Sequence, residues 1–223
     1  MEKNKSFAAN IIRWYKKNGR SYPWRRTKDP FRILVSEIML QKTDTKKVLS
    51  VYPAVIKKYS TPAHFAKANL RSLKKDIHLL GISDRARRLR TTSRTILELH
   101  KGRVPSARKN LLELLGVGDY IANAVLCFAF CKDVPLLDSN VIRVIKRVFS
   151  VESKKERART DKELWGYAGS LVPKGKAIDY NRGILDFAAA VCTARNPKCF
   201  VCPTNFICNY YSSSVVGKSS LSC

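Results

Sequence analysis

The sequence predicts an all-α protein with two lobes and a cysteine-rich loop near its C-terminus. Apolar residues recur at helical spacing along most of the chain, and no run of alternating apolar and polar residues indicates a strand. Short turns containing glycine or proline separate these segments, as at Gly102, Pro105 and Pro135. With 223 residues, 45% of them hydrophobic, the chain can bury a core in one large or two small domains.

The expected helices follow from their apolar faces and their start signals. Residues 6–18 place apolar side chains on one side, with lysine and arginine opposite. Asp29 before Pro30 and Thr61 before Pro62 are typical of a helix N-terminus, where a capping side chain precedes a proline. Further helices are expected at residues 69–79, 84–99, 106–115, 119–131, 138–149, 160–171 and 180–190.

The chain carries a large excess of positive charge. Lys and Arg number 43 against 17 Asp and Glu, which gives a formal net charge of +26. This surplus favours a polyanionic partner, either nucleic acid or an anionic membrane surface. The longest apolar run, residues 124–131, is far shorter than the roughly 18 residues of a membrane span, and no helix has the basic and apolar faces of a membrane-surface helix. Because the N-terminus also lacks an apolar signal core, we expect an intracellular, nucleic-acid-binding protein in the cytoplasm or nucleoid.

A glycine-containing turn joins two helical segments at about residues 111–131. Gly116 and Gly118 flank Val117 immediately before the second segment. A Gly-x-Gly turn at a helix start exposes backbone N–H groups and the positive end of the helix dipole, which together suit phosphate oxygens. An ordinary tight turn is the alternative, but the basic composition favours a helix-hairpin-helix motif that grips one DNA strand. The five arginines in residues 85–94 are either a solvated helix face or a second surface for the DNA backbone.

Four of the seven cysteines lie within 17 residues, at Cys192, Cys199, Cys202 and Cys208. Their spacing is C-x6-C-x2-C-x5-C, whereas a zinc site generally pairs two close doublets separated by a longer spacer. Four thiolates on one compact loop fit the corners of a [4Fe–4S] cluster better than a tetrahedral zinc ion. We therefore expect this loop to hold a [4Fe–4S] cluster and to order the C-terminal part of the chain.

Two carboxylates occupy unusual positions in the sequence. Glu37 lies inside the largely apolar stretch 33–40, and Asp138 directly precedes the helical segment that begins near Ser139. Paired carboxylates suit the cleavage of a glycosidic bond, because one can donate a proton while the other stabilises positive charge on the sugar or orients water. Structural roles are the alternatives: Glu37 on the polar face of a helix, and Asp138 as an N-cap.

Together, the hairpin, the aspartate and the cysteine loop resemble the helix-hairpin-helix superfamily of DNA glycosylases, in the iron–sulfur branch that includes endonuclease III. The resemblance runs from about Trp14 to Tyr211. It implies that Asp138, about twenty residues after the hairpin glycines, is catalytic. It also implies that the four-cysteine loop binds a [4Fe–4S] cluster.

Within this superfamily the chain is similar to the mismatch-specific glycosylases. Tyr22-Pro23-Trp24-Arg25 and residues 36–43 resemble adenine glycosylases that act on A opposite 8-oxoguanine, in which the glutamate at position 37 assists base departure. Residues 171–176, with Val104-Pro105, Arg108-Lys109 and Asp186-Phe187, resemble the archaeal-type thymine glycosylases that remove T or U mispaired with G. The resemblance implies base excision repair of a mismatched base in double-stranded DNA, most similar to the second group.

The resemblance also assigns further site residues. Bifunctional members carry a lysine at position 120 that forms a Schiff base, whereas a Tyr120 phenol cannot form an imine, so we expect a monofunctional enzyme. Tyr120 would line the base pocket or pack over the sugar; a core aromatic at a helix start is the alternative. The residues expected to contact DNA or fill the gap left by an extruded nucleotide are Gln41, Lys42, Ser83, Asp84, Arg85, Gly116 and Gly118.

Two other functions stay open at this point. An adenine glycosylase is disfavoured because the chain ends 15 residues after Cys208, without room for a further domain, and because paired tyrosines are absent near Gly81. A non-catalytic DNA-binding module is disfavoured because both carboxylates are retained.

The domain organisation follows from the placement of these motifs. We expect a helical-bundle domain at residues 26–134, which carries the hairpin, and a cluster domain formed by residues 1–25 and 135–211. Residues 212–223 are serine-rich and are expected to be a disordered tail. A monomer is expected to bind DNA in the cleft between the two lobes, with Asp138 and Glu37 on its walls.

Overall fold

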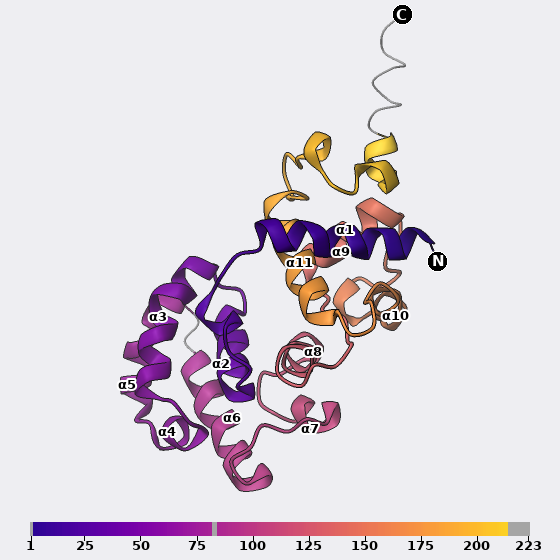
Figure 1. Ribbon diagram of the computed structural model, residues 1–223. Coiled ribbons are helices and arrows are strands. Elements are labelled where there is room, and N and C mark those ends of the chain that lie inside the picture. The colour runs from indigo at the N-terminus through magenta and orange to yellow at the C-terminus, as the bar shows by residue number, and fades with distance from the viewer. Residues whose placement is uncertain (1, 82–83, 214–223) are drawn as a thin grey trace, which may run out of the picture. The chain divides into compact units, whose positions relative to one another are not determined.

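The computed structural model describes residues 2–81 and 84–213. The described residues form helices, 3-10 turns and loops without a β-strand, which confirms the all-α prediction (Figure 1). The chain divides into two compact units. The first combines the described part of Met1–Arg20 with that of Asp133–Cys223, and the second is Ser21–Lys132.

The first unit is built around α1 (Glu2–Asn18), which lies against α11 (Ala177–Ala190) (Figure 1). Gly183 permits this close approach, because a Cβ atom there would lie 2.9 Å from Ile11 Cγ2. Trp14 of α1 and Phe187 of α11 make an edge-to-face aromatic contact, with ring centroids 5.8 Å apart. The two helices therefore join residues from the two ends of the chain into one core.

The remaining helices of the first unit complete this core. They are α9 (Ser139–Phe149), η3 (Ala158–Thr160) and α10 (Lys162–Ser170), followed after α11 by η4 (Cys199–Val201) and η5 (Asn205–Ile207). Helix α9 packs against α11 and buries one apolar face, formed by Val141, Val144, Ile145 and Val148. This packing fixes the N-terminus of α9, where Asp138 lies.

The second unit surrounds the apolar helix α2 (Pro30–Leu40). Eight residues of α2 are buried, and the helix packs against α3 (Thr45–Lys58), α6 (Arg85–His100) and α8 (Asp119–Phe128). The other elements are η1 (Pro23–Arg25), α4 (Pro62–Lys67), α5 (Leu70–Asp76), η2 (His78–Leu80) and α7 (Arg108–Leu112). The expected capping signals are present: the Asp29 carboxylate accepts from Phe31 N at 2.8 Å, and Thr61 Oγ1 accepts from His64 N at 3.3 Å.

Side-chain contacts show where the chain first passes from one unit to the other. Arg20 belongs to the first unit, since its Nε donates to Asp186 Oδ1 of α11 at 2.8 Å. Trp24 belongs to the second unit, where its ring packs edge-on against Tyr52 at 5.4 Å. The chain therefore passes between units near residue 20 rather than at the expected residue 25.

Residues 212 and 213, which were expected to belong to a disordered tail, are helical. Ser212 N donates to Cys208 O at 3.1 Å, and Ser213 Oγ donates to Asn209 O at 3.0 Å, so both serines continue a helical turn. The rest of the expected tail lies outside the described residues. Within the described ranges, no helix combines the length and the apolar composition that crossing a bilayer requires.

Candidate functional site

Asp138 caps the N-terminus of α9. Its Oδ1 accepts from Asn140 N at 2.9 Å and from Val141 N at 2.8 Å, and its Oδ2 accepts from the Asn140 side-chain amide at 2.8 Å. The N-cap interpretation is therefore correct. The side chain is only partly buried, so one carboxylate can both cap the helix and present negative charge at its surface.

A chain of hydrogen bonds links Asp138 to the cysteine loop. Asn140, which donates to Asp138, accepts from Arg143 Nη1 at 3.0 Å through its side-chain oxygen. Arg143 Nε donates to Cys192 O at 3.0 Å, and its Nη2 donates to Ala188 O at 2.9 Å. The Arg143 guanidinium thus connects the start of the cysteine loop, through Asn140, to the Asp138 carboxylate at the N-terminus of α9.

The segment before Asp138 is anchored by a buried amide. Asn181 of α11 is fully buried, accepts from Leu136 N at 3.0 Å and donates to Val134 O at 2.9 Å. These bonds supply partners for backbone N–H and C=O groups that an irregular, buried segment cannot pair within itself. They fix the path of the backbone that leads into the α9 cap.

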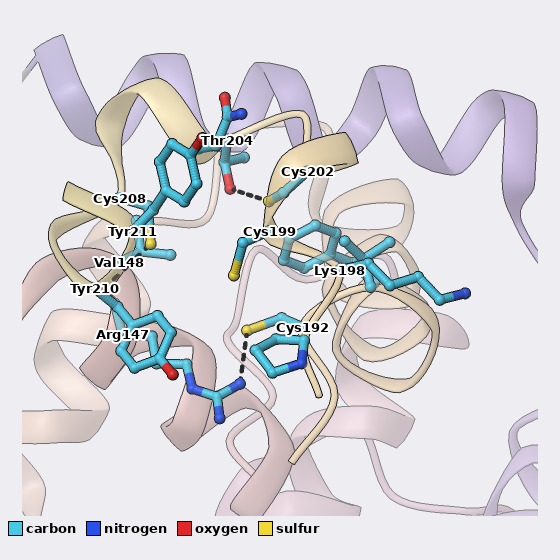
Figure 2. Close-up of a pocket in the computed structure, with 14 residues that line it drawn as sticks. Arg147, Val148, Cys192, Lys198, Cys199, Cys202, Thr204, Cys208, Tyr210 and Tyr211 are labelled. Atoms are coloured by element: carbon cyan, nitrogen blue, oxygen red, sulfur yellow. Dashed lines mark hydrogen bonds between the residues drawn. The ribbon is translucent and has the colours of Figure 1, made fainter. Parts of the chain in front are cut away.

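The four cysteines of the loop line one pocket (Figure 2). Figure 2 shows their sulfur atoms facing a common space, with Val148 and Tyr211 beside them. Thr204 Oγ1 lies 3.3 Å from Cys202 Sγ. The four inward-facing thiols, all within 17 residues, are the type of ligand set that an iron–sulfur cluster uses, and the walls around them are apolar.

The charged side chains that line this pocket are Arg147 and Lys198. Arg147 Nη1 lies 3.6 Å from Cys192 Sγ and also donates to Thr193 O at 2.6 Å. Burial raises the pKa of the Cys199 thiol, and burial likewise raises the pKa of Cys202. Within the described ranges no three His, Cys, Asp or Glu side chains are grouped closely enough to hold a single metal ion.

Glu37 lies in the second unit, on the buried part of α2. Only 7% of the residue is exposed, and its neighbours Ser36 and Ile38 are each 1% exposed. The alternative interpretation, in which Glu37 lies on an exposed polar face of its helix, is therefore wrong. A carboxylate carried at this depth on a helix is a functional-site candidate, because burying a charged group has a large free-energy cost and such groups gather at functional sites.

The hairpin turn has the geometry expected for a phosphate site. Gly116 has a φ of +83°, and a Cβ there would lie 3.0 Å from Arg88 Cδ, so a side chain is disfavoured on both counts. Gly118 is the N-cap of α8, where no side-chain cap occupies the first-turn amides, and a Cβ there would meet open space. Tyr120, in the first turn of α8, is partly exposed. The α8 N-terminus is thus accessible to an anion.

Gln41 directly follows α2 and docks on this hairpin. Its Nε2 donates to Gly116 O at 2.9 Å, and its Oε1 accepts from Arg88 Nη1 at 3.2 Å. Arg88 Nε in turn donates to Asp84 Oδ2 at 3.1 Å. Lys42 is exposed, with a φ of +50°. The structure therefore brings four expected DNA-contacting residues into one part of the second unit.

Two expected DNA contacts have a different outcome. Arg85 is 1% exposed and its guanidinium donates to four protein oxygens, so this side chain is not placed to make the direct DNA contact that was expected of it. Ser83 lies outside the described residues. Asn140 and Arg143, which link Asp138 to the cysteine loop, were not predicted from the sequence. The signal for them was that they lie three residues apart in the helix that Asp138 caps.

The chain is similar to known proteins over most of its length. Residues 35–169 match the model of the HhH-GPD superfamily base excision DNA repair proteins. The chain is 43% identical to a thymine/uracil-DNA glycosylase of Pyrobaculum aerophilum, covering 92% of this chain and 91% of the relative. It is 42% identical to a thymine-DNA glycosylase of Aeropyrum pernix, covering 91% and 93%.

A solved structure has the same fold. The structure of a thermostable thymine-DNA glycosylase superposes with a TM-score of 0.90 at 38% identity and covers 95% of this chain and 98% of its own. The family model, the similarity along almost the entire chain and the shared fold lead to one conclusion. This protein is a member of the HhH-GPD superfamily of base excision DNA repair proteins.

Proposed function

We propose that this protein is a monofunctional DNA glycosylase that removes T or U mispaired with G from double-stranded DNA. The observation that carries the proposal is Asp138, held at the α9 N-cap in a chain 43% identical to a thymine/uracil-DNA glycosylase. The net charge of +26 suits a DNA substrate. We further propose that the protein acts as an intracellular monomer in the cytoplasm or nucleoid.

The reaction breaks the bond between C1′ of the sugar and the pyrimidine nitrogen. The bonding electrons leave with the base, positive charge develops on the sugar, and water adds to C1′. Asp138 stabilises that positive charge and orients the water, because its carboxylate is fixed by three hydrogen bonds. Glu37 positions the departing base or donates a proton to it.

The target nucleotide must leave the helical stack before this reaction, because the bond lies inside the duplex. A mispaired base costs less to extrude than a paired one, which contributes to selectivity for G·T and G·U. Gly116 and Gly118 are proposed to bind a phosphate, and Gln41, Lys42 and Asp84 to contact the DNA around the extruded nucleotide.

A [4Fe–4S] cluster fits the cavity of the cysteine loop. Cys192, Cys199, Cys202 and Cys208 would hold it, each binding one iron at a corner of the cube, so the four sulfurs need not converge on one point. Such a cluster would supply a covalent tie across a loop whose exposed Phe200 and Phe206 add little to the core. Its proposed role is structural.

The monofunctional character rests on position 120. A primary amine forms an imine with the C1′ aldehyde of an abasic site, whereas the Tyr120 phenol does not. Tyr120→Lys is therefore expected to gain strand cleavage without alkali and a borohydride-trapped covalent complex. No gain by a folded, DNA-binding variant would contradict this placement of residue 120.

The proposal is tested with duplexes that carry T, U or A opposite G, and A opposite 8-oxoguanine, each followed by alkali cleavage of abasic sites. Cleavage of the G·T and G·U duplexes alone is the expected result. Cleavage only of duplexes with a target adenine would replace the proposal with an adenine glycosylase. Tight binding without cleavage of any duplex would indicate a non-catalytic DNA-binding module.

A further inference from the structure

We propose that Arg85 is a positioning residue that fixes the turn at residues 41–43 against the end of η2, and so sets the shape of the surface that enters the duplex. This inference rests on the proposed function. Arg85 begins α6, is 1% exposed and faces inward. It is therefore not placed to bind phosphate, although its position in a run of arginines suggested that role.

One guanidinium joins two segments of the chain, residues 38–43 and the end of η2. Arg85 Nε donates to Ile38 O of α2 at 3.1 Å, and Nη1 donates to Leu80 O of η2 at 2.8 Å. Its Nη2 donates to Gln41 O at 2.5 Å and to Thr43 Oγ1 at 2.7 Å. The acceptors therefore lie on the last turn of α2, on the turn that follows it and on the segment that precedes α6.

These four acceptors are all neutral oxygens. A buried cation that bonds to neutral groups gives up hydration without the gain of an ion pair, so its hydrogen bonds must offset that cost. Burial, together with the charge of Arg88, lowers the pKa of Arg85. The planar fork of an arginine can reach several acceptors at fixed angles, whereas a lysine presents one ammonium group.

The turn that Arg85 holds is strained. Lys42 has a φ of +50°, a left-handed conformation that a residue with a side chain rarely adopts. Arg85 Nη2 bonds on both sides of this residue, to Gln41 O and to Thr43 Oγ1. The backbone of the turn is thus held from inside the unit, while the Lys42 side chain is exposed.

The Gln41 side chain is held by a separate set of contacts. Its side-chain amide bonds to Gly116 O and to Arg88 Nη1. These two bonds can break while Arg85 still donates to the backbone oxygen of Gln41. Arg85 therefore keeps the base of the turn fixed while the Gln41 side chain moves into the gap left by the extruded nucleotide.

The test compares Arg85→Lys and Thr43→Val with wild type. Ser93→Ala is the matched control, because it removes a buried hydrogen bond within α6, to Leu89 O at 2.8 Å, with no link to the turn. Three quantities are measured: the single-turnover rate on a G·T duplex, the rise in fluorescence of a 2-aminopurine placed next to the target base, and the affinity for a matched G·C duplex.

We expect Arg85→Lys to lower the single-turnover rate about 10- to 100-fold and to reduce the 2-aminopurine signal, since small displacements of positioning groups have effects of this size. Affinity for the matched duplex should stay within about 2-fold, because the phosphate contacts are unchanged. Thr43→Val should move the first two quantities in the same direction by less, and Ser93→Ala should move neither.

If wild type is active and Arg85→Lys has the same rate and the same fluorescence rise, the inference is overturned while the proposed function stands. If Arg85→Lys does not fold, Thr43→Val decides, and wild-type behaviour of that variant overturns the inference. A wild type that cuts no duplex in the panel instead overturns the proposed function, and this inference with it.

Discussion

The turn at residues 41–43 and the cysteine loop at residues 192–208 are stabilised by the same kind of bond. In each case, an arginine on a nearby helix donates to backbone carbonyl oxygens of an irregular segment. Arg85 does so for the turn in the second unit, and Arg143 and Arg147 do so for the loop in the first unit. Both segments lack the regular partners that a helix or sheet would supply.

The two arrangements differ in where the charge lies. Arg85 is buried among neutral oxygens, so it fixes backbone geometry and adds little charge to the surface. Arg147 Nη1 lies 3.6 Å from Cys192 Sγ, so the charge of this arginine lies beside a thiol. Its Cζ lies 5.0 Å from the Tyr210 ring centroid. The same type of bond therefore fixes a turn around a buried arginine in one unit and a loop beside four thiols in the other.

The largest effect is expected from Cys199→Ser. Loss of one thiolate should release the cluster, and the melting temperature should fall by at least about 5 °C because the first unit loses its cross-link. Bound iron, visible absorbance and thermal unfolding are the measurements. Cys131→Ser is the control, since Cys131 is exposed and lies outside the loop. Equal iron content in wild type and Cys199→Ser would contradict the ligand assignment.

An intermediate effect is expected when the two arginines of α9 are replaced separately. Arg143→Met should lower the single-turnover rate about 10-fold with iron retained, because it breaks the link between Asn140 and Cys192 O. Arg147→Met should mainly speed the loss of iron, because the positive charge next to Cys192 Sγ is removed. The reverse pattern in rate and iron content would show that the link to Asp138 has been assigned to the wrong arginine.

The smallest effect is expected at Asp84. Hydrogen bonds from Arg87, and then from Arg88, hold the pKa of this carboxyl below its usual range. Its contribution to stability is therefore present above about pH 4 and is lost as the pH falls through its lowered pKa. Asp84→Asn should reduce the acid-induced drop in melting temperature by about 1–2 °C, since these exposed pairs are weak. An identical drop in wild type and variant would show that the pair contributes nothing measurable.

The helical architecture and several local features could be predicted from the sequence because their signals are local. Asp29-Pro30, the two hairpin glycines and the aspartate before Ser139 each specify a helix end within a few residues. The cysteine spacing likewise predicts the thiols that line one cavity. Helix ends were less accurate, as for residues 119–131, where α8 ends at Phe128.

The role of Arg85 was missed because the run of five arginines was treated as a single surface. Leu89, Thr92, Ser93 and Ile96 are all buried and lie 4, 7, 8 and 11 residues after Arg85, so helical periodicity placed this arginine on the inward face. Three of its four acceptors belong to Ile38, Gln41 and Thr43, which lie more than 40 residues away in the sequence. Only the folded unit shows that backbone carbonyls meet there.

The most direct test of the account is the single-turnover cleavage of a G·T duplex by Asp138→Asn. Asparagine is also a good N-cap, so the variant should keep α9 and the affinity for DNA while it loses the negative charge at C1′. We predict that its excision rate is at least about 10³-fold lower than that of wild type, with a similar melting temperature. Excision by Asp138→Asn at the wild-type rate would contradict the account.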